Sequence, residues 1–365
     1  MSGDRRSGPR VPATSIARSN HFHGYDYRAR VNSAPTVTTR SANVDGLRVI
    51  ALLAIVVGHV YTESELAERL VQSWRLPLFF VLAGYFWRAG SGWLSDLTKR
   101  WRSTAVPYLA WLVILTAIAI PASADPAGRV ADALLGGSYA LRPLTTFWFL
   151  SCLFFAALLY RALEGAPAWL SGALCVGGLL VNILAGELLA LVPLSIGTAL
   201  GAVAFIWCGD LVRRLMLDLP AQRRRRVAWA LLLPPVVLLA AVDDFTTLDM
   251  KDGEFPVLAV LVALLLSCGF VVLADAAPAP PAKVAATYRA VTGAAVVVVL
   301  VHPLVLTVLP PASAPVPSLV IAVLAFTAPL ALGLVLASTR AAPLLLGRPS
   351  TGHVGGRRAG APSRS

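Results

Sequence analysis

The chain has 365 residues, of which 57% are hydrophobic and only 14% are charged, and its mean hydropathy is +0.72. Soluble domains carry about 25% charged residues, so this composition excludes a water-soluble globular protein and indicates one embedded in lipid. The net charge of +12 does not indicate nucleic-acid binding, because the basic residues lie in short segments between apolar runs and no recognition fold accompanies them.

Both ends of the chain differ in composition from its middle. Residues 1–42 are rich in Arg, Ser, Pro and Asn and contain no apolar core of signal-peptide type, so we expect a disordered, basic cytoplasmic tail. Residues 339–365 are expected to form a second disordered cytoplasmic tail, and residues 43–338 the membrane-embedded domain. No metal site is predicted, because the four cysteines lie in apolar runs without metal-ligand spacing.

The middle of the chain consists of apolar runs bounded by charged residues, Pro or Gly. A membrane-spanning helix needs about 20 mainly apolar residues, because its backbone must satisfy its own hydrogen bonds in hydrocarbon. The runs predict an all-α, polytopic membrane protein with about ten transmembrane helices. These cover residues 44–61, 75–89, 104–121, 144–163, 167–184, 188–208, 227–242, 256–273, 290–309 and 317–338.

The charges between the runs predict an orientation. If the ten helices alternate from a cytoplasmic N-terminus, Arg213 and Arg223–Arg226 lie in the cytoplasm, whereas Asp243 and Asp249 lie outside. Positively charged segments resist translocation, so this partition favours the cytoplasmic membrane with both termini in the cytoplasm.

The first predicted helix carries ionisable residues at two depths. Arg48 and His59 are 11 residues apart, which on a helix is three turns plus about 20° and a rise of about 16 Å. Both side chains therefore point to one side, and Asp45 lies one turn before Arg48 and can pair with it. Such residues usually face a cavity. The alternative is that Arg48 snorkels to one surface and His59 forms a hydrogen bond near the other.

The sequence around these residues resembles a known family. Arg48, ten further residues and His59, preceded by Asp45-Gly46-Leu47, resemble the Arg-x10-His signature of acyltransferase family 3. These are ten-helix membrane O-acyltransferases, among them fucose 4-O-acetylase-like proteins. The similarity extends over residues 43–338 and is densest from 43 to 160.

Three further stretches follow in the family's order. Pro77–Phe86 is similar to the second-helix Phe-Phe-x-x-Ser-Gly-Phe motif, Lys99–Arg102 to the basic stretch before the third helix, and Phe147–Leu150 to the Trp-Phe-Leu segment. Two positions depart from the pattern. Ala83 stands where the family usually has Ser, and Thr146 stands where a His often precedes the Trp segment.

The resemblance implies transfer of an acyl group, which we expect to be acetyl, from acyl-CoA to a hydroxyl of a glycan, glycolipid or glycosylated metabolite. Acetyl-CoA is then a co-substrate and no bound cofactor is expected; the other expected partners are the lipid bilayer and the carbohydrate acceptor. A general base assists such a hydroxyl, and imidazole, with a reference pKa of about 6.5, suits this role. On this basis His59 is the base, Arg48 engages the acyl donor or its phosphates, and Asp45 orients Arg48.

The remaining candidates have weaker support, and each has a plainer alternative. Arg100 and Arg102 are placed to hold the CoA phosphates, or they serve only as cytoplasmic topology charges. Tyr85 and Trp148 line the acceptor site, or they belong to the interfacial aromatic belt.

Two more ionisable residues lie near predicted helix ends. His302, just before Pro303, is a second group in the cavity or else a hydrogen-bonded packing residue. Glu63 orients His59 from one turn further on, or is an exposed loop carboxylate. The rival function is a multi-pass transporter with an intramembrane Arg/His substrate or proton path, although the two halves of the chain show no convincing similarity.

Overall fold

The computed structural model describes residues 41–62, 64–65, 68–90, 92–243, 245–309 and 315–348. Most of the two predicted tails and the candidate Glu63 lie outside these residues. Within them the regular secondary structure is helical, apart from one isolated β-bridge between Asp249 and Glu254. The all-α prediction is confirmed.

The helices follow one another along the chain with short connections. They are α2 (Ala42–Val60), η1 (Glu68–Gln72), α4 (Pro77–Tyr85), α5 (Trp93–Arg100), η2 (Trp101–Ala105), α6 (Val106–Ala119), η3 (Ile120–Ala122), α7 (Pro126–Leu135), η4 (Gly137–Tyr139), α8 (Phe147–Ala162), α9 (Ala168–Ala190), η5 (Pro193–Ser195), α10 (Ile196–Met216), α11 (Ala221–Ala241), α12 (Val257–Ala276), α13 (Ala282–Gly293), α14 (Ala295–Val308), α15 (Pro315–Ala337) and α16 (Ala342–Leu345).

Six helical stretches in the described part of the chain are long and apolar enough to cross a membrane. They are Ala42–Val60, Trp93–Ala122, Ala168–Ala190, Pro193–Met216, Val257–Ala276 and Ser318–Ala337. A seventh arises if α13 and α14, bent by 60°, form one broken span. Large apolar side chains are exposed along α9, α11 and α15, as expected where lipid is the surrounding solvent.

Each of the ten predicted ranges falls on a helix, but not every such helix is long enough to cross a bilayer. Helix α4 has only 9 residues and α8 has 16. Helix α11 is long, but its first turns contain Arg223–Arg226, so part of it is strongly polar. The protein is therefore a multi-pass helical membrane protein, while the number of ten crossings and the cytoplasmic location of both termini stay predictions.

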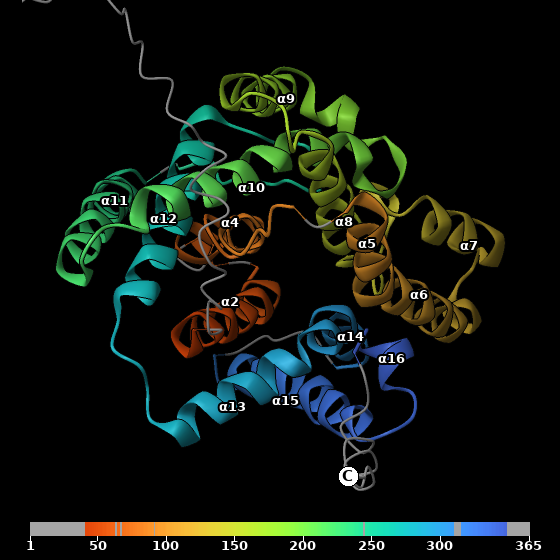
Figure 1. Cartoon of the computed structure of the whole chain (residues 1–365). Coiled ribbons are helices and arrows are strands. Elements are labelled where there is room, and N and C mark those ends of the chain that lie inside the picture. The colour runs from red at the N-terminus through yellow and green to blue at the C-terminus, as the bar shows by residue number, and fades with distance from the viewer. Residues whose placement is uncertain are drawn as a thin grey trace, which may run out of the picture. The chain divides into compact units, whose positions relative to one another are not determined.

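Helix α10 is the centre of one half of the bundle. It packs against α4, α8 and α9, and Figure 1 shows it lying across these helices. Helix α2 packs against α12 on one side and against α13, α14 and α15 on the other. The helix with the predicted Arg48 and His59 pair therefore lies between two groups of helices and is not on the rim.

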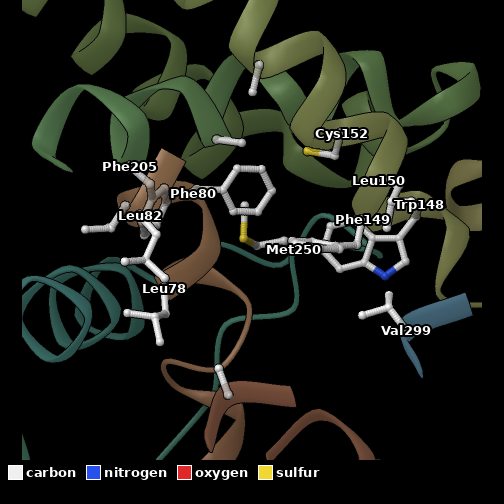
Figure 2. Close-up of a cluster of buried hydrophobic side chains, with 14 of the residues drawn as sticks. Leu78, Phe80, Leu82, Trp148, Phe149, Leu150, Cys152, Phe205, Met250 and Val299 are labelled. Atoms are coloured by element: carbon white, nitrogen blue, oxygen red, sulfur yellow. The ribbon is translucent and has the colours of Figure 1, made fainter. Parts of the chain in front are cut away.

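The core joins segments that are distant in sequence. Phe80 of α4 is fully buried and contacts Phe149 of α8 edge to face, with ring centroids 5.5 Å apart. Figure 2 shows these side chains together with Phe205 of α10, Met250 of the loop before α12, and Val299 of α14. Burial of this apolar surface fixes α4, α8 and α14 relative to one another.

The chain beyond residue 338 does not leave the bundle at once. Ala342 and Leu346 are buried, and the Trp111 side chain in α6 donates a hydrogen bond of 3.0 Å from Nε1 to the Leu345 carbonyl. The short helix α16 is therefore packed on α6, and residues 342–346 belong to the folded unit.

Candidate functional site

The N-terminal turns of α2 hold the expected ion pair. Arg48 donates from Nη1 to Asp45 Oδ1 at 3.0 Å, and the Asp45 side chain is buried. The Arg48 guanidinium also lies 5.2 Å from the centre of the Phe86 ring, at the end of α4. Asp45 and the aromatic ring thus hold the cation at a defined depth beside α4.

A second polar cluster lies at the other end of α2. His59 in the last turn of α2 and His302 in α14 have ring centroids 5.3 Å apart, with planes inclined by 40°. Because α2 is unbroken from Ala42 to Val60, the rise of about 16 Å between Arg48 and His59 follows from regular helix geometry. The structure therefore brings His302 to His59, and places both a few turns from Arg48.

The environment of His302 determines its tautomer. The ring is completely buried, and Nδ1 lies 2.8 Å from the Val298 carbonyl oxygen. A carbonyl only accepts hydrogen bonds, so we assign the proton to Nδ1, which leaves Nε2 with a lone pair. Nε2 is buried and has no hydrogen-bond partner among the described residues. His302 is thus a fixed hydrogen-bond acceptor next to His59.

Sequence reasoning missed a third member of this cluster, Arg75. Its side chain is only 4% exposed and donates hydrogen bonds to the carbonyls of Ala54 and Ile55 in α2. Its guanidinium lies against Gly58, the residue before His59. The only sign of Arg75 in the sequence is a cation directly before an apolar run. Such a cation also marks an ordinary helix boundary, so the sequence alone predicts only the start of a span at Arg75.

The aromatic candidates lie at different places. Trp148, in the first turn of α8, is buried beside Val299 of α14, one turn before His302 (Figure 2). Tyr85, the last residue of α4, is also buried and contacts Phe86, the residue beneath Arg48. Trp148 thus lies near the histidine end of the site and Tyr85 near the Arg48 end, and the acceptor-site role of both stays a prediction.

One departure from the family pattern also faces this region. Thr146 is buried and donates a hydrogen bond of 2.8 Å from Oγ1 to the Val299 carbonyl. The position at which the family often has a His therefore contacts α14 one turn before His302. Elsewhere in the described residues, no three His, Cys, Asp or Glu side chains converge where they would hold a metal ion.

A comparison with known families identifies the chain. A family model described as an acyltransferase domain, that of acyltransferase family 3, matches residues 41–338. The chain belongs to this family. No curated protein and no solved structure matches it. The match extends from the start of α2 to the end of α15 and so includes both ends of the site.

Family membership establishes a membrane acyltransferase in general terms. It favours acyl transfer over the transporter alternative, because the residues in question lie in a domain whose members move acyl groups. In this acyltransferase the Asp45–Arg48 pair and the histidine pair are carried on α2 and α14, both within the matched residues.

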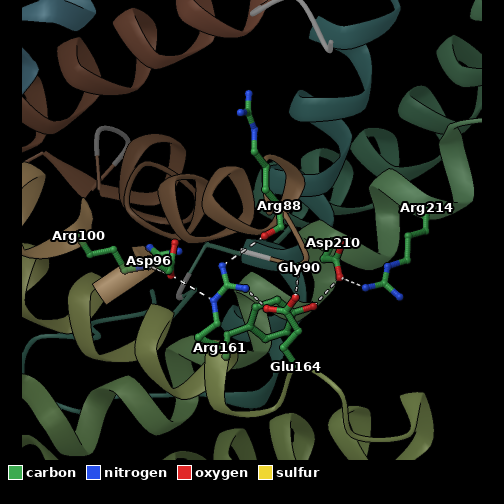
Figure 3. Close-up of polar contacts among 9 residues, drawn as sticks. Arg88, Gly90, Asp96, Arg100, Arg161, Glu164, Asp210 and Arg214 are labelled. Atoms are coloured by element: carbon green, nitrogen blue, oxygen red, sulfur yellow. Dashed lines mark hydrogen bonds and ion pairs between the residues drawn. The ribbon is translucent and has the colours of Figure 1, made fainter. Parts of the chain in front are cut away.

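The two basic candidates before α6 differ in their surroundings. Arg100 donates from Nε to Asp96 Oδ2 at 2.6 Å and lies 4.8 Å from the centre of the Trp87 ring. Arg161 of α8 donates to the same carboxylate oxygen at 3.2 Å (Figure 3), and it also contacts the Trp87 ring. Arg102, in η2, is exposed and has no ion-pair partner among the described residues. Arg102 is therefore the better placed of the two to meet a mobile anion.

The shared carboxylate predicts a structural effect of Asp96→Asn. Asp96 and Arg161 are both buried, and removing one partner from a buried ion pair costs about 3–5 kcal/mol. We expect a lower melting temperature of the detergent-purified protein. Asp218→Asn is the matched control, because Asp218 is exposed and has no ion-pair partner among the described residues. Equal melting temperatures for the two variants would mean that this network does not hold α5 to α8.

Proposed function

We propose that this acyltransferase moves an acetyl group from acetyl-CoA to a hydroxyl of a glycan, glycolipid or glycosylated metabolite at the cytoplasmic membrane, with both termini in the cytoplasm. The observation that carries the proposal is the arrangement on α2. A carboxylate-held cation and an imidazole lie on one side of the helix, and a second, buried imidazole faces the first. Family membership supports the acyl chemistry, and the side chains support a hydroxyl acceptor.

The chemistry needs a base and a site for the acyl donor. His59 takes the proton from the acceptor hydroxyl as its oxygen bonds to the thioester carbonyl carbon. The carbon–sulfur bond then breaks, and the CoA thiolate leaves and receives the proton from the His59 imidazolium. His302, with its unprotonated Nε2, accepts a hydrogen bond from the acceptor or from His59. No bound cofactor is needed for these steps.

The other candidates take roles that follow from their positions. Arg48 holds the donor near its phosphates and Asp45 orients Arg48, while the exposed Arg102 and the Asp96-bound Arg100 add positive charge on the proposed cytoplasmic side. Trp148 lies at the histidine end, where the acceptor would bind.

The proposal is tested by following the acetyl group. Purified protein is incubated with [14C]acetyl-CoA and a detergent extract of cell membranes, and the labelled product is analysed by mass spectrometry. We expect a covalent product one acetyl group heavier than its precursor, with label released by alkaline hydroxylamine as an O-ester requires. A transporter gives no covalent product, and label that resists alkaline hydroxylamine would exclude an O-acyl linkage.

The role of Arg48 predicts a selective effect on the donor. Arg48→Lys keeps a cation beside Asp45 but loses the planar fork that matches phosphate. We expect the KM for acetyl-CoA to rise on the order of 10-fold, the loss of one charged hydrogen bond, with a smaller change in kcat. Arg340→Ala is the control, because Arg340 is an exposed cation just after α15. Equal donor KM values for Arg48→Lys and the wild type would remove Arg48 from the donor site.

A further inference from the structure

Arg75 is a buried cation that no carboxylate among the described residues contacts. It precedes α4, and within that part of the chain its guanidinium is held by neutral groups: the carbonyls of Ala54 and Ile55 accept from Nη1 at 3.4 and 3.2 Å, and Gln72 Oε1 accepts from Nη2. Among the described residues no carboxylate lies within ion-pair distance of it. Burying an uncompensated charge is costly, and such residues within membrane segments usually serve function.

The more distant acidic residues do not neutralise this cation by contact. Glu68 and Asp249 act on the charge of Arg75 through space. Glu68 accepts a hydrogen bond from Thr247 at 3.0 Å, and Asp249 accepts from the backbone N–H of Lys251 at 2.9 Å. Both carboxylates are thus bound by other groups, Glu68 in η1 and Asp249 in the loop before α12, and neither accepts a hydrogen bond from Arg75.

A glycine that directly precedes the proposed base leaves space for the Arg75 side chain. A Cβ atom at Gly58 would overlap Nη1 of Arg75, so only glycine at this position lets the guanidinium lie against α2. Gly58 directly precedes His59. The cation therefore lies against the last turns of α2, at the residue before His59, and its close approach depends on that glycine.

The guanidinium has a hydrogen-bond donor to spare. An arginine side chain carries five N–H groups, and the three hydrogen bonds of Arg75 come from Nη1, to two carbonyls, and from Nη2, to one amide oxygen. Nε is buried and has no acceptor among the described residues. The Nε–H is thus a buried donor that no acceptor among the described residues uses, and it can donate to an oxygen atom of a ligand.

We propose that Arg75 binds the thioester carbonyl oxygen of the acyl donor and stabilises the negative charge that this oxygen acquires. The proposal rests on the proposed acyl transfer at His59. As the acceptor oxygen bonds to the carbonyl carbon, the C=O π pair moves onto the oxygen facing Arg75, and His59 takes the acceptor proton. The pair then re-forms the C=O bond, the carbon–sulfur bond breaks, and the CoA thiolate takes the proton from His59. Buried donors aimed at such an oxygen act most strongly where water is excluded.

The test separates chemistry from binding. Arg75→Gln and Arg75→Lys are assayed with [14C]acetyl-CoA and the membrane extract, and binding is measured with two unreactive donors. S-ethyl-CoA lacks the carbonyl oxygen, whereas acetyldethia-CoA, a ketone with methylene in place of sulfur, retains it. We expect kcat to fall roughly 10²–10³-fold in Arg75→Gln, as for loss of an oxyanion donor, with weaker binding of the ketone and unchanged binding of S-ethyl-CoA.

Two further variants keep the result interpretable. Arg75→Lys keeps a charge but lacks the Nε–H, and we expect its kcat to fall by at least 10-fold. Arg69→Gln is the matched control with unchanged kcat, because Arg69 lies in the same connection but is bound to the Val242 carbonyl and to Asp243.

The outcomes that overturn the assignment are distinct from failure of acyl transfer itself. If the wild-type protein transfers no acetyl group, the proposed function fails. If it does, unchanged kcat in Arg75→Lys, or a raised acceptor KM with unchanged kcat, overturns the oxyanion role. Failure of both Arg75 variants to fold would make Arg75 structural and would overturn it as well.

Discussion

Replacing His59 with alanine is expected to reduce acyl transfer roughly 10²–10⁴-fold, the usual contribution of a positioned general base, without unfolding the protein. The imidazole is partly exposed and has no hydrogen-bond partner among the described residues, so its loss removes little structural support. Its main contact is with the ring of His302. The measurement is kcat with [14C]acetyl-CoA, together with size-exclusion chromatography and circular dichroism of the purified variant.

Two other substitutions serve as a control for His59→Ala and as a test of His302 as the base. Leu53→Ala is the control on the same helix, because Leu53 is 40% exposed on an apolar face, and we expect normal kcat. His302→Ala removes the second imidazole and leaves the Val298 carbonyl without its partner. If His59→Ala keeps full activity while His302→Ala loses it, the base is His302, and the role given to His59 is wrong.

The sequence predicts the features of α2 well because they are local. Asp45 and Arg48 are one turn apart, and the separation from Arg48 to His59 depends only on helix geometry. The positions of most helices can also be predicted from local sequence, because the backbone of an apolar run in lipid must satisfy its own hydrogen bonds and does so as a helix. These predictions required no knowledge of how the helices pack.

The partners of His59 were harder to predict, because they come from other helices. Its contact with His302 depends on how α14 packs against α2, and the approach of Arg75 to the preceding residue of α2 depends on Gly58. In sequence, an arginine before an apolar run marks a boundary, and nothing local indicates that it turns inward. The surroundings of Arg100 were hard to predict for the same reason: its carboxylate partner Asp96 is shared with Arg161 on a distant helix.

Hydropathy also fails to predict where two of the helices break or end. The predicted range 290–309 is broken after Gly293, where α13 and α14 meet at 60°. The range 75–89 ends early, at Tyr85, and the following turn includes Gly90 with φ of 83°, a conformation that favours glycine. An apolar average over 20 residues does not reveal either break.

Gly84→Ala is expected to have a large effect on stability. Gly84 lies in the stretch that resembles the family's second-helix motif, and a Cβ there would overlap the Ile206 carbonyl oxygen in α10. Small residues allow membrane helices to approach backbone to backbone. Overpacking costs about 1–3 kcal/mol and occasionally more, and here the obstacle is a main-chain carbonyl that cannot rotate away. We expect a large fall in melting temperature and in the yield of monodisperse protein.

Gly177→Ala is the control, and we expect it to change stability in the opposite direction. Gly177 is inside α9 and a Cβ there meets no atom within 4 Å, so Gly177→Ala is expected to stabilise by about 0.5–1 kcal/mol through helix propensity alone. A normal melting temperature for Gly84→Ala would show that α4 and α10 are not in backbone contact.

Gly209 of α10 tests whether the contact is reciprocal. A Cβ on Gly209 would overlap the Val81 carbonyl oxygen of α4, so each of the two glycines permits the same close helix–helix contact, one from each helix. Once either alanine has forced the helices apart, the second meets less resistance. We therefore expect the double variant to lose clearly less stability than the sum of the two single variants, since neighbouring sites in one contact are coupled. If the losses of stability in the two single variants are strictly additive, the two glycines belong to separate contacts. Helix α4 is then held against α10 mainly by side chains such as Phe80 and Phe205.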